Sequence, residues 1–306
     1  MLFMFPGQGS QKIGMGKDLF DKFETARDVF NEVDDTISFK LSKLMFSGDA
    51  DELQQTQNAQ PAIMTVSLAF VRVMKKDFGI DLSKFAKYFA GHSLGEYSAL
   101  CAAKVLSLAD TARILRTRGE AMAKAYPTGG AMAAIIGLSI EKIEEIISTV
   151  NDVQIANDNS VGQVVISGSE DAVKTAMQSL KENGAKLVVP LSVSGAFHSK
   201  FMKPAEDPVK EILDATAFNN PTAPIIANVT AKAESNNFKQ LLIDQLTNRV
   251  RWRETIVFAH DNGVENFVEI GNGNVLTGLV KRTVKDVKMI NINSIESIEN
   301  FVDEVK

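Results

Sequence analysis

Cysteine is nearly absent from this sequence of 306 residues, and histidine and tryptophan are scarce. Cys101 is the only cysteine, which excludes an intramolecular disulfide framework and a zinc site built from several thiolates. The only histidines are His92, His198 and His260, so few residues can supply an imidazole base. No apolar run approaches the roughly 20 residues of a membrane-spanning helix, and we expect no membrane partner.

A strong excess of charge of either sign is also missing. The net charge of −5 gives no electrostatic reason to expect nucleic acid or an anionic membrane as a partner. The apolar start of the chain, residues 1–5, is too short for a signal-peptide core and is cut off by Pro6 and Gly7. We therefore expect a soluble, cytoplasmic protein with two domains, or with one large domain that carries an insertion.

Compact apolar runs alternate with amphipathic helical stretches over most of the chain. Apolar residues between 19 and 33 recur at helical spacing. Residues 61–73 are apolar almost all round and predict a buried helix with Pro61 in its first turn. The alternation predicts an α/β domain with a largely parallel sheet. Its clearest strands are residues 2–5, 87–90, 224–228, 266–270 and 287–292.

The middle of the chain has a different order of elements. Strand, helix, strand, strand, helix and strand follow one another, which is the ferredoxin-like (βαββαβ) order. We therefore expect an inserted subdomain at 127–195 within a larger domain formed by 1–126 and 196–306; the turn-rich residues 126–130 mark its start, and Ser194 with Gly195 marks its end. The predicted strands are 131–138, 153–156, 163–167 and 186–191, and the predicted helices are 140–150 and 172–183.

The strongest local motif is Gly-His-Ser-Leu-Gly at residues 91–95, a match to G-x-S-x-G. A predicted strand precedes it and a stretch rich in small residues follows, which is the context of a nucleophile elbow. The glycines allow a tight turn that lifts the Ser93 hydroxyl clear of the sheet. The helix N-terminus behind it supplies N–H groups for an oxyanion. A glycine-rich turn without chemistry is the alternative.

A serine nucleophile needs a base, and the three histidines fit that role unequally. His92 adjoins Ser93, and adjacent side chains diverge at a sharp turn, so we expect it in the pocket wall. His260 suits the C-terminal end of a helix, where its charge is favourable. His198 lies in a loop that leaves the predicted subdomain, a typical place for a catalytic residue. By elimination we predict His198 as the base; a surface histidine is the alternative.

Nothing in the sequence selects the group that orients this base. An amide or a main-chain carbonyl can orient an imidazole as well as a carboxylate can. Spacing favours none of the candidate carboxylates, which are Asp158, Asp171, Glu182 and Asp244.

A glycine-rich loop follows the first predicted strand. Residues 5–11 read Phe-Pro-Gly-Gln-Gly-Ser-Gln, and their glycines let the backbone approach a ligand. An N–H group of this loop would complete an oxyanion hole with the N–H of Leu94. A loop without a site is the alternative. Lys12 stands where G-x-G-x-x-G requires its last glycine, so a dinucleotide site is poorly supported.

Three arginines, Arg113, Arg116 and Arg118, lie downstream of the elbow. One that points inward over the serine would grip a free carboxylate with two parallel hydrogen bonds. Spacing does not choose among them, and solvated side chains on a helix are the alternative.

Taken together, these motifs closely resemble those of the malonyl-CoA:acyl carrier protein transacylases of fatty acid synthesis. The resemblance covers essentially the whole chain. It implies an α/β-hydrolase-like core with a ferredoxin-like insertion. The segments that carry it are 5–11, 91–96, Arg118 and Gly119 with Met122, 162–168, 196–199, Gln245 and Leu246 with Trp252, and 275–279.

The resemblance also implies a role for each matching residue. Ser93 matches the acylated nucleophile, His198 the base, and the main-chain N–H groups of Gln8 and Leu94 the oxyanion hole. Arg118 matches the clamp on the malonyl carboxylate.

Three further matches concern the walls of the site. Gln245 matches a residue that helps to hold the histidine and the site, and His92 matches the pocket histidine beside the serine. Phe197 matches the aromatic residue that crowds an α-methyl group in malonyl-selective members. Two departures concern loop rigidity, because Arg249 and Asn272 stand where family members usually carry proline.

The implied reaction passes a malonyl group from malonyl-CoA to serine, and then to the phosphopantetheine thiol of an acyl carrier protein. It needs no bound cofactor or metal. The alternatives are a serine thioesterase or esterase of the same fold, an acyltransferase of a polyketide pathway, and a non-catalytic scaffold. An acidic carrier protein needs a basic docking patch, which either Lys281, Arg282 and Lys285 or Arg249, Arg251 and Arg253 can supply; solvated helix faces are the alternative.

Overall fold

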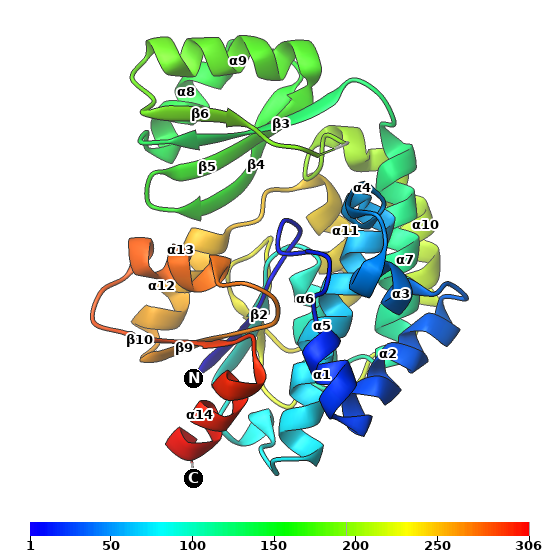
Figure 1. Cartoon of the computed structure of the whole chain (residues 1–306). Helices are drawn as coiled ribbons and strands as arrows, with labels where there is room; N and C mark the ends of the chain where they lie inside the picture. The colour runs from blue at the N-terminus through cyan, green and yellow to red at the C-terminus, as the bar shows by residue number, and fades with distance from the viewer. Residues whose placement is uncertain (194, 306) are drawn as a thin grey trace.

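The chain folds around two separate β-sheets. The computed structural model describes residues 1–193 and 195–305, so Ser194, where we expected the end of the insertion, lies outside the described residues. Within the described part, one sheet has six strands in the order β10-β9-β1-β2-β7-β8 and the other has four in the order β4-β5-β3-β6. Figure 1 shows the smaller sheet with its helices above the body that contains the larger sheet.

The larger sheet is parallel except at one edge. Its parallel strands are β1 (Leu2–Phe5), β2 (Tyr88–Gly91), β7 (Ile225–Ile226), β9 (Asn266–Ile270) and β10 (Lys288–Ile292). The short β8 (Ala233–Glu234) runs antiparallel to β7. The expected parallel α/β core is therefore confirmed, although β7 is only two residues long where we predicted five.

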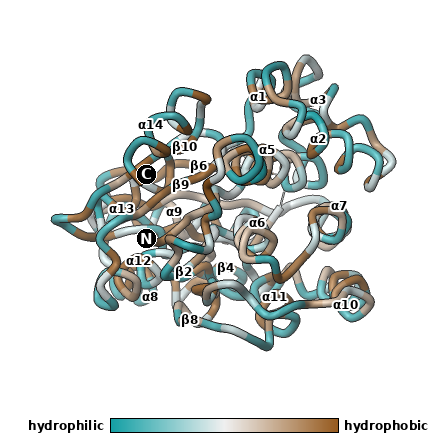
Figure 2. The backbone as a smooth tube through the Cα atoms, turned by 90° about the horizontal axis from the view of Figure 1, so that it is seen from below, coloured by the Kyte–Doolittle hydropathy of each residue, from teal (hydrophilic) through white to brown (hydrophobic). Residues whose placement is uncertain are grey.

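Successive side chains of β1 point to opposite sides, so both faces of this sheet are apolar, and helices cover both. Phe3 and Phe5 belong to the main hydrophobic core, whereas Leu2 and Met4 pack into a second cluster with Trp252. Hydrophobic stretches gather along the strands in Figure 2, and hydrophilic ones prevail at the periphery. The helices are α1 (Lys17–Lys22), α2 (Glu24–Thr36), α3 (Leu41–Ser47), α4 (Ala50–Gln54), α5 (Thr56–Lys76), α6 (Gly95–Ala102), α7 (Leu108–Ala125), α10 (Glu206–Asp214), α11 (Phe238–Thr247), α12 (Trp252–Asp261), α13 (Val275–Thr283) and α14 (Ile295–Val305), with 3₁₀ turns η1 (Leu82–Lys84) and η2 (Lys200–Ala205).

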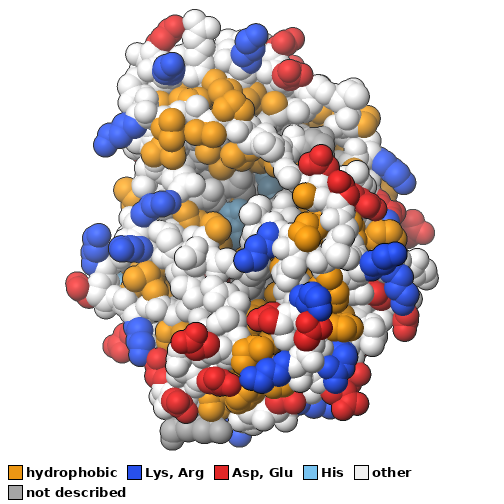
Figure 3. Space-filling model, in the orientation of Figure 1, with side chains coloured by type: hydrophobic (Ala, Val, Ile, Leu, Met, Phe, Trp, Pro, Cys, Tyr) orange, Lys and Arg blue, Asp and Glu red, His pale blue; other side chains and the backbone are white. Residues whose placement is uncertain are grey.

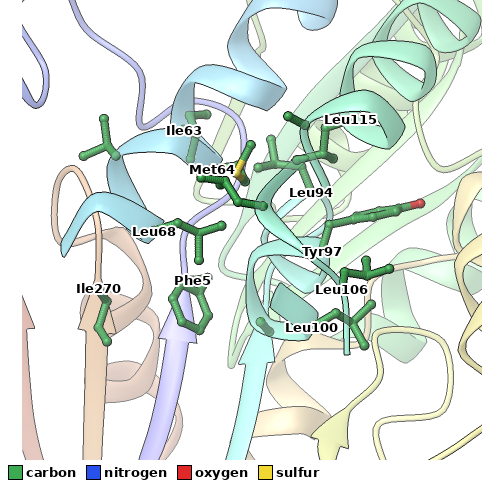
Figure 4. Packing of buried hydrophobic residues seen from close by; sticks show 14 of the residues in the cluster. Phe5, Ile63, Met64, Leu68, Leu94, Tyr97, Leu100, Leu106, Leu115 and Ile270 are labelled. Carbon is green, nitrogen blue, oxygen red and sulfur yellow. The ribbon is translucent and has the colours of Figure 1, made fainter. Parts of the chain in front are cut away.

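The buried helix α5 is longer than its apolar run. It begins at Thr56, so our placement of Pro61 in a first turn is wrong. Proline lacks the N–H that would bond the carbonyl of Gln57, and the Arg116 guanidinium donates to that carbonyl instead at 3.3 Å. Figure 4 shows side chains of α5 packed between β1 and α6.

The smaller sheet has the expected βαββαβ order. Its strands β3 (Gly130–Ile136), β4 (Val153–Ser160), β5 (Gln163–Ser169) and β6 (Leu187–Pro190) are antiparallel, and α8 (Ile140–Ile147) and α9 (Glu170–Glu182) pack against them in one hydrophobic cluster.

The strand β4 runs four residues further than we predicted. Its irregular second half reaches the larger body, where the Asp158 N–H donates to the carbonyl of Val250 at 2.9 Å. This contact accounts for the extra length, which no local sequence pattern signals. Among the described residues, no helix is both long and apolar enough to cross a membrane.

Candidate active site

A sharp turn joins β2 to α6 and presents Ser93. This residue has φ of 52°, in the left-handed region that non-glycine residues rarely adopt. Asn228 stabilises the turn: its Oδ1 accepts from the Ser93 N–H at 2.8 Å, and its Nδ2 donates to the Gly91 carbonyl at 2.7 Å. The geometry is that of a nucleophile elbow held in place from the end of the neighbouring strand β7.

The two glycines of the motif are needed because backbones approach each other closely there. A Cβ at Gly91 would lie 1.9 Å from the carbonyl carbon of Gly95, and a Cβ at Gly95 would lie 2.2 Å from the Phe5 oxygen. The end of β1 therefore packs directly against the elbow, which brings the loop after β1 beside Ser93.

The structure brings His198 to Ser93. The distance from Ser93 Oγ to His198 Nε2 is 2.7 Å, and His198 Nδ1 lies 2.8 Å from the main-chain oxygen of Gln245. A carbonyl oxygen can only accept, so Nδ1 carries the proton and Nε2 is free to act as a base. Burial, followed by the charge of Arg118, lowers the pKa of His198 to about 3, which keeps the imidazole neutral.

A main-chain carbonyl, and not a carboxylate, therefore orients the imidazole. Asp158, the one proposed carboxylate that is buried, binds Arg253 instead at 2.8 Å. The position of Gln245 on α11 sets this carbonyl, and sequence spacing contains no trace of it.

Arg118 of α7 lies beside Ser93 and is fully buried. Its Nη2 is 3.2 Å from Ser93 Oγ and donates to Gln245 Oε1 at 2.9 Å, while its Nη1 donates to Gln60 Oε1 at 2.6 Å. Within the described residues its Nε has no hydrogen-bond partner. The guanidinium also lies over the Tyr97 ring, 5.4 Å from its centre.

No carboxylate of the described residues lies within ion-pair distance of this buried cation. Among the described residues, the arginines that form ion pairs are Arg113, Arg116, Arg249, Arg251 and Arg253. Burial lowers the pKa of Arg118, which shows the cost of holding the charge there. Of the three arginines that the sequence left open, Arg118 alone reaches the serine; Arg113 and Arg116 pair with Asp110 and Glu120.

A cavity of about 320 Å³ opens over Ser93. Figure 3 shows histidine side chains in the hollow between the part that contains the smaller sheet and the main body. The cavity is lined by residues of the smaller sheet, of helices α4 and α7 and of several loops, including those that follow β1 and β2: Gln8, Gly9, Gln11, Gln54, His92, Ser93, Leu94, Arg118, Met122, Met132, Asn157, Leu191, Ser192, Val193, Phe197 and His198.

Two main-chain N–H groups at this cavity are available to an oxyanion. In the described part of the chain, neither the Gln8 nor the Leu94 N–H donates to a protein acceptor. Gly7 permits this approach of the loop, since a Cβ there would lie 2.7 Å from the His92 oxygen.

The remaining predicted site residues differ in whether they line the cavity. His92 and Phe197 line the cavity, and His92 Nε2 lies 2.8 Å from Asn159 Oδ1. Gln245 does not line it but lies behind Arg118 and His198, completely buried. His260 lies in the last turn of α12 and does not line the cavity, as expected for a helix-end residue.

Sequence reasoning missed the polar side chains that support the reactive ones. Asn228, Gln60 and Glu96 each bond a residue of the site, and none belongs to a motif that predicts such a role alone. The only signal in the sequence was a polar residue within an apolar segment: Asn228 ends the predicted strand 224–228, and Gln60 lies in the buried helix α5. Among the described residues, no group of histidine, cysteine, aspartate and glutamate side chains could hold a metal ion.

At the two positions where family members usually carry proline, Arg249 and Asn272 bind neighbouring parts of the chain. Arg249 lies 2.8 Å from Glu144 of α8 and 3.6 Å from Glu254 of α12. Asn272 Nδ2 donates to the carbonyl of Ser10, in the loop that carries Gln8. Both loops are therefore restrained by hydrogen bonds where proline would restrain them through φ.

Comparisons with known proteins agree with this geometry. The family model of the acyl transferase domain matches residues 2–300. A malonyl CoA-acyl carrier protein transacylase of Bacillus subtilis is 46% identical, over 99% of this chain and 96% of the relative. A crystal structure of an acyl-carrier-protein S-malonyltransferase from Bartonella henselae aligns with a TM-score of 0.96 and 51% identity, covering 99% of this chain and 98% of that one.

A further solved structure contains a malonyl-transacylase together with its partner. It shows a type II polyketide acyl-carrier protein in complex with that enzyme, and it aligns with a TM-score of 0.94, 39% identity and 99% coverage of both chains. The matches extend over nearly the whole length of this chain and of these relatives. The chain belongs to the acyl transferase family, among the malonyl CoA-acyl carrier protein transacylases.

Proposed function

We propose that this protein transfers the malonyl group of malonyl-CoA to the phosphopantetheine thiol of an acyl carrier protein, and so supplies extender units for fatty acid synthesis. One observation carries the substrate assignment: a buried guanidinium that forms no ion pair with any described residue lies 3.2 Å from the Ser93 hydroxyl. A thioester donor that bears its own carboxylate satisfies this cation and places its carbonyl over the serine.

In the first half-reaction, Ser93 is the nucleophile and His198 the base. His198 Nε2 takes the hydroxyl proton while Ser93 Oγ attacks the thioester carbonyl. The N–H groups of Gln8 and Leu94 hold the negative oxygen of the tetrahedral intermediate, a contribution of about 3 kcal/mol for one such donor. Collapse breaks the C–S bond, the proton passes from His198 to the leaving thiolate, and CoA departs.

The second half-reaction runs the same chemistry with another thiol. The phosphopantetheine thiol gives its proton to His198 and attacks the malonyl-serine ester. Collapse of the second intermediate returns the proton to Ser93 Oγ and releases malonyl-carrier protein. The kinetics are therefore ping-pong.

Arg118 supplies the selectivity and Phe197 shapes the acyl pocket. Two parallel N–H groups of Arg118 can grip the malonate carboxylate, which acetyl groups and water do not offer. Phe197 is 5% exposed and faces the cavity, where it crowds a substituent on the malonyl α-carbon. His92 completes the pocket wall, and Gln245 holds both His198 and Arg118.

Several finer statements belong to the same proposal. The protein uses malonyl-CoA and a carrier protein as substrates and holds no resident cofactor. We divide the chain into a catalytic unit, 1–126 with 196–306, and an inserted unit, 127–195, each of which has its own sheet. A cytoplasmic location stays a prediction. A polyketide pathway is the second candidate, since one solved relative is a complex with a polyketide carrier protein.

Intact-protein mass spectrometry after brief mixing with malonyl-CoA tests the proposal. Wild-type protein should gain one malonyl group and lose it on addition of carrier protein, whereas Ser93→Ala should gain none. Steady release of CoA without an acceptor and without an adduct would identify a hydrolase. If the wild-type protein gained no adduct and released no CoA, that result would contradict the proposed donor.

A further inference from the structure

The side-chain amide of Gln245 lies between one donor and three acceptors. Its Oε1 accepts from Arg118 Nη2 at 2.9 Å. Its Nε2 donates to Glu96 Oε2 at 2.7 Å and lies 3.1 Å from the Ser93 carbonyl and 3.3 Å from Asn228 Oδ1. The two ends of the amide therefore face opposite chemistry, and all of these groups are held inside the protein.

Only one orientation of this amide suits Arg118. Rotation by 180° would aim the NH₂ group at the guanidinium, which is donor against donor, because arginine cannot accept a hydrogen bond. The same rotation would place Oε1 against three oxygen atoms. The position of Arg118 over Ser93 thus depends on which end of the amide faces it.

Glu96 is the strongest of the three acceptors. Its contact with Gln245 is the shortest, and it is the only one of the three whose oxygen can carry a full charge. Glu96 is 1% exposed in helix α6, and its Oε2 also accepts from the Asn228 N–H at 3.1 Å. No role in the two half-reactions requires this carboxyl group, although it lies one turn of helix from the nucleophile.

We propose that Glu96 is a positioning residue that determines specificity: it fixes the Gln245 amide with Oε1 toward Arg118, and so sets the guanidinium to receive the malonyl carboxylate. This inference rests on the proposed function. Gln245 also holds His198, but through its main-chain oxygen, which rotation of the side-chain amide does not move. Glu96 therefore acts on the carboxylate clamp and not on the base.

Protonation of Glu96 leaves this role intact. Burial raises the pKa of Glu96 to about 7, and the charged groups that face it are Arg118 of α7, which lowers the pKa, and Glu234 of β8, which raises it. Both hydrogen bonds named above end on Oε2, so a proton on Oε1 leaves Oε2 free to accept. The amide keeps its orientation on either side of neutral pH.

The test measures acylation of Ser93 by malonyl-CoA and by acetyl-CoA, with rapid-quench mass spectrometry, in Glu96→Ala and Glu96→Gln. Loss of the acceptor in Glu96→Ala should lower kcat/KM for malonyl-CoA by roughly tenfold more than for acetyl-CoA, the effect of one charge-assisted hydrogen bond. Glu96→Gln keeps an oxygen acceptor, and its malonyl-to-acetyl ratio should stay within about threefold of the wild type.

Glu269 supplies the matched control. It is also buried, and it accepts from the N–H groups of Leu276 and Thr277 at the start of α13. Glu269→Ala should lower the melting temperature and leave the malonyl-to-acetyl ratio unchanged. Equal losses for both donors in Glu96→Ala, in step with its melting temperature, would reduce Glu96 to a structural residue and overturn the inference.

Gln245→Met keeps the inference testable if Glu96→Ala does not fold. It removes both ends of the amide, and it should lose malonyl preference by a similar factor, with no additional loss when combined with Glu96→Gln. Wild-type preference in Gln245→Met would overturn the inference. An absent malonyl adduct on wild-type protein would instead contradict the proposed function, so the two failures are distinguishable.

Discussion

Two arginines in this molecule, the half-buried Arg253 and the fully buried Arg118, differ in how their charge is met. Arg253 of α12 binds Asp158 of β4, with its Nε 3.0 and 2.9 Å from the two carboxylate oxygens and its Nη2 2.8 Å from Oδ2. Arg118 at the cleft has amide and hydroxyl oxygens as partners and, among the described residues, no ion pair. The first arginine joins helix α12 to strand β4 of the smaller sheet, and the second faces a cavity.

The difference distinguishes an arginine that stabilises the fold from an arginine that is placed to recognise a ligand. The hydrogen bonds to Asp158 raise the pKa of Arg253, so its charge stabilises the structure. Burial lowers the pKa of Arg118, so its charge costs stability until an anion arrives. A buried cation that forms no ion pair with the described residues and lies next to the proposed nucleophile is the feature that distinguishes a substrate site from a structural ion pair.

Replacing each arginine in turn by alanine gives the strongest test of this comparison. Arg118→Ala should lower kcat/KM for malonyl transfer about 100-fold or more, because it removes two charge-assisted hydrogen bonds to the substrate. Arg253→Ala should leave malonyl transfer nearly unchanged but destabilise the fold by about 3 kcal/mol, because it leaves the buried Asp158 carboxylate unpaired. Steady-state kinetics and urea unfolding measure the two effects.

Acetyl transfer is the internal control for Arg118→Ala, since acetyl-CoA has no carboxylate to bind. Its rate should fall far less than the malonyl rate. Equal losses for both donors would show that Arg118 acts on the shared chemistry and would remove its assignment as the clamp.

A single substitution can give Arg118 a carboxylate partner like the one that Arg253 has in Asp158. Gln60→Glu places a carboxylate where Oε1 now accepts from Arg118 Nη1 at 2.6 Å. This internal anion competes with malonate, so KM for malonyl-CoA should rise by roughly tenfold while acetyl transfer changes little. Matching Gln57→Glu, at a half-buried position of α5 whose side chain donates to Gln55 Oε1 and not to Arg118, should change neither. An unchanged KM in Gln60→Glu would mean that the clamp does not need an unmet charge.

The pH dependence of acylation tests His198, the proposed base beside Arg118. With a pKa of about 3, His198 is neutral at pH 5.5, so acylation should lose little of its rate between pH 7.5 and 5.5. An ordinary histidine would lose about tenfold over this interval. Arg118 lowers this pKa, so in Arg118→Ala the acid limb of acetyl transfer should move to higher pH, and in Arg253→Ala it should stay. A wild-type limb near pH 6.5 would contradict a buried, neutral base.

The sequence predicts the fold where the pattern is local. Alternating apolar runs and turn residues place β1 and β9 to the residue, because buried parallel strands need uninterrupted apolar character. The same reasoning fails at β4 and β7. The second half of β4 is set by contact with Val250 in the other part of the molecule, and no pattern within the strand carries that information.

The site divides in the same way. Ser93 and His198 are predictable because a nucleophile requires a sharp turn and a base, and few residues fit. Arg118 is reached only through resemblance, since three neighbouring arginines share one helix. Gln245, Gln60 and Glu96 act through side chains that meet in three dimensions, and their hydrogen bonds connect residues 58 to 149 positions apart in sequence.

The weakest effect should come from the protein surface, where paired and unpaired cations also occur. Arg249, Arg251 and Arg253 contact Glu144, Glu254 and Asp158, so this candidate docking cluster is largely neutralised. Among the described residues, Lys281, Arg282 and Lys285 form no ion pair, although Arg282 donates to Gln163 Oε1 at 2.7 Å.

By the rule that separates Arg118 from Arg253, the unpaired cluster is the one left for an acidic carrier protein. Neutralising Lys281, Arg282 and Lys285 to glutamine should raise KM for the carrier protein severalfold, roughly 0.5 kcal/mol for each exposed contact, and the effect should shrink as salt increases. KM for malonyl-CoA should not change, and Arg249→Gln with Arg251→Gln should leave both constants alone. If the paired cluster proves the more sensitive one, charge left unmet does not mark the docking surface, and the rule holds only inside the cleft, where water cannot replace the missing partner.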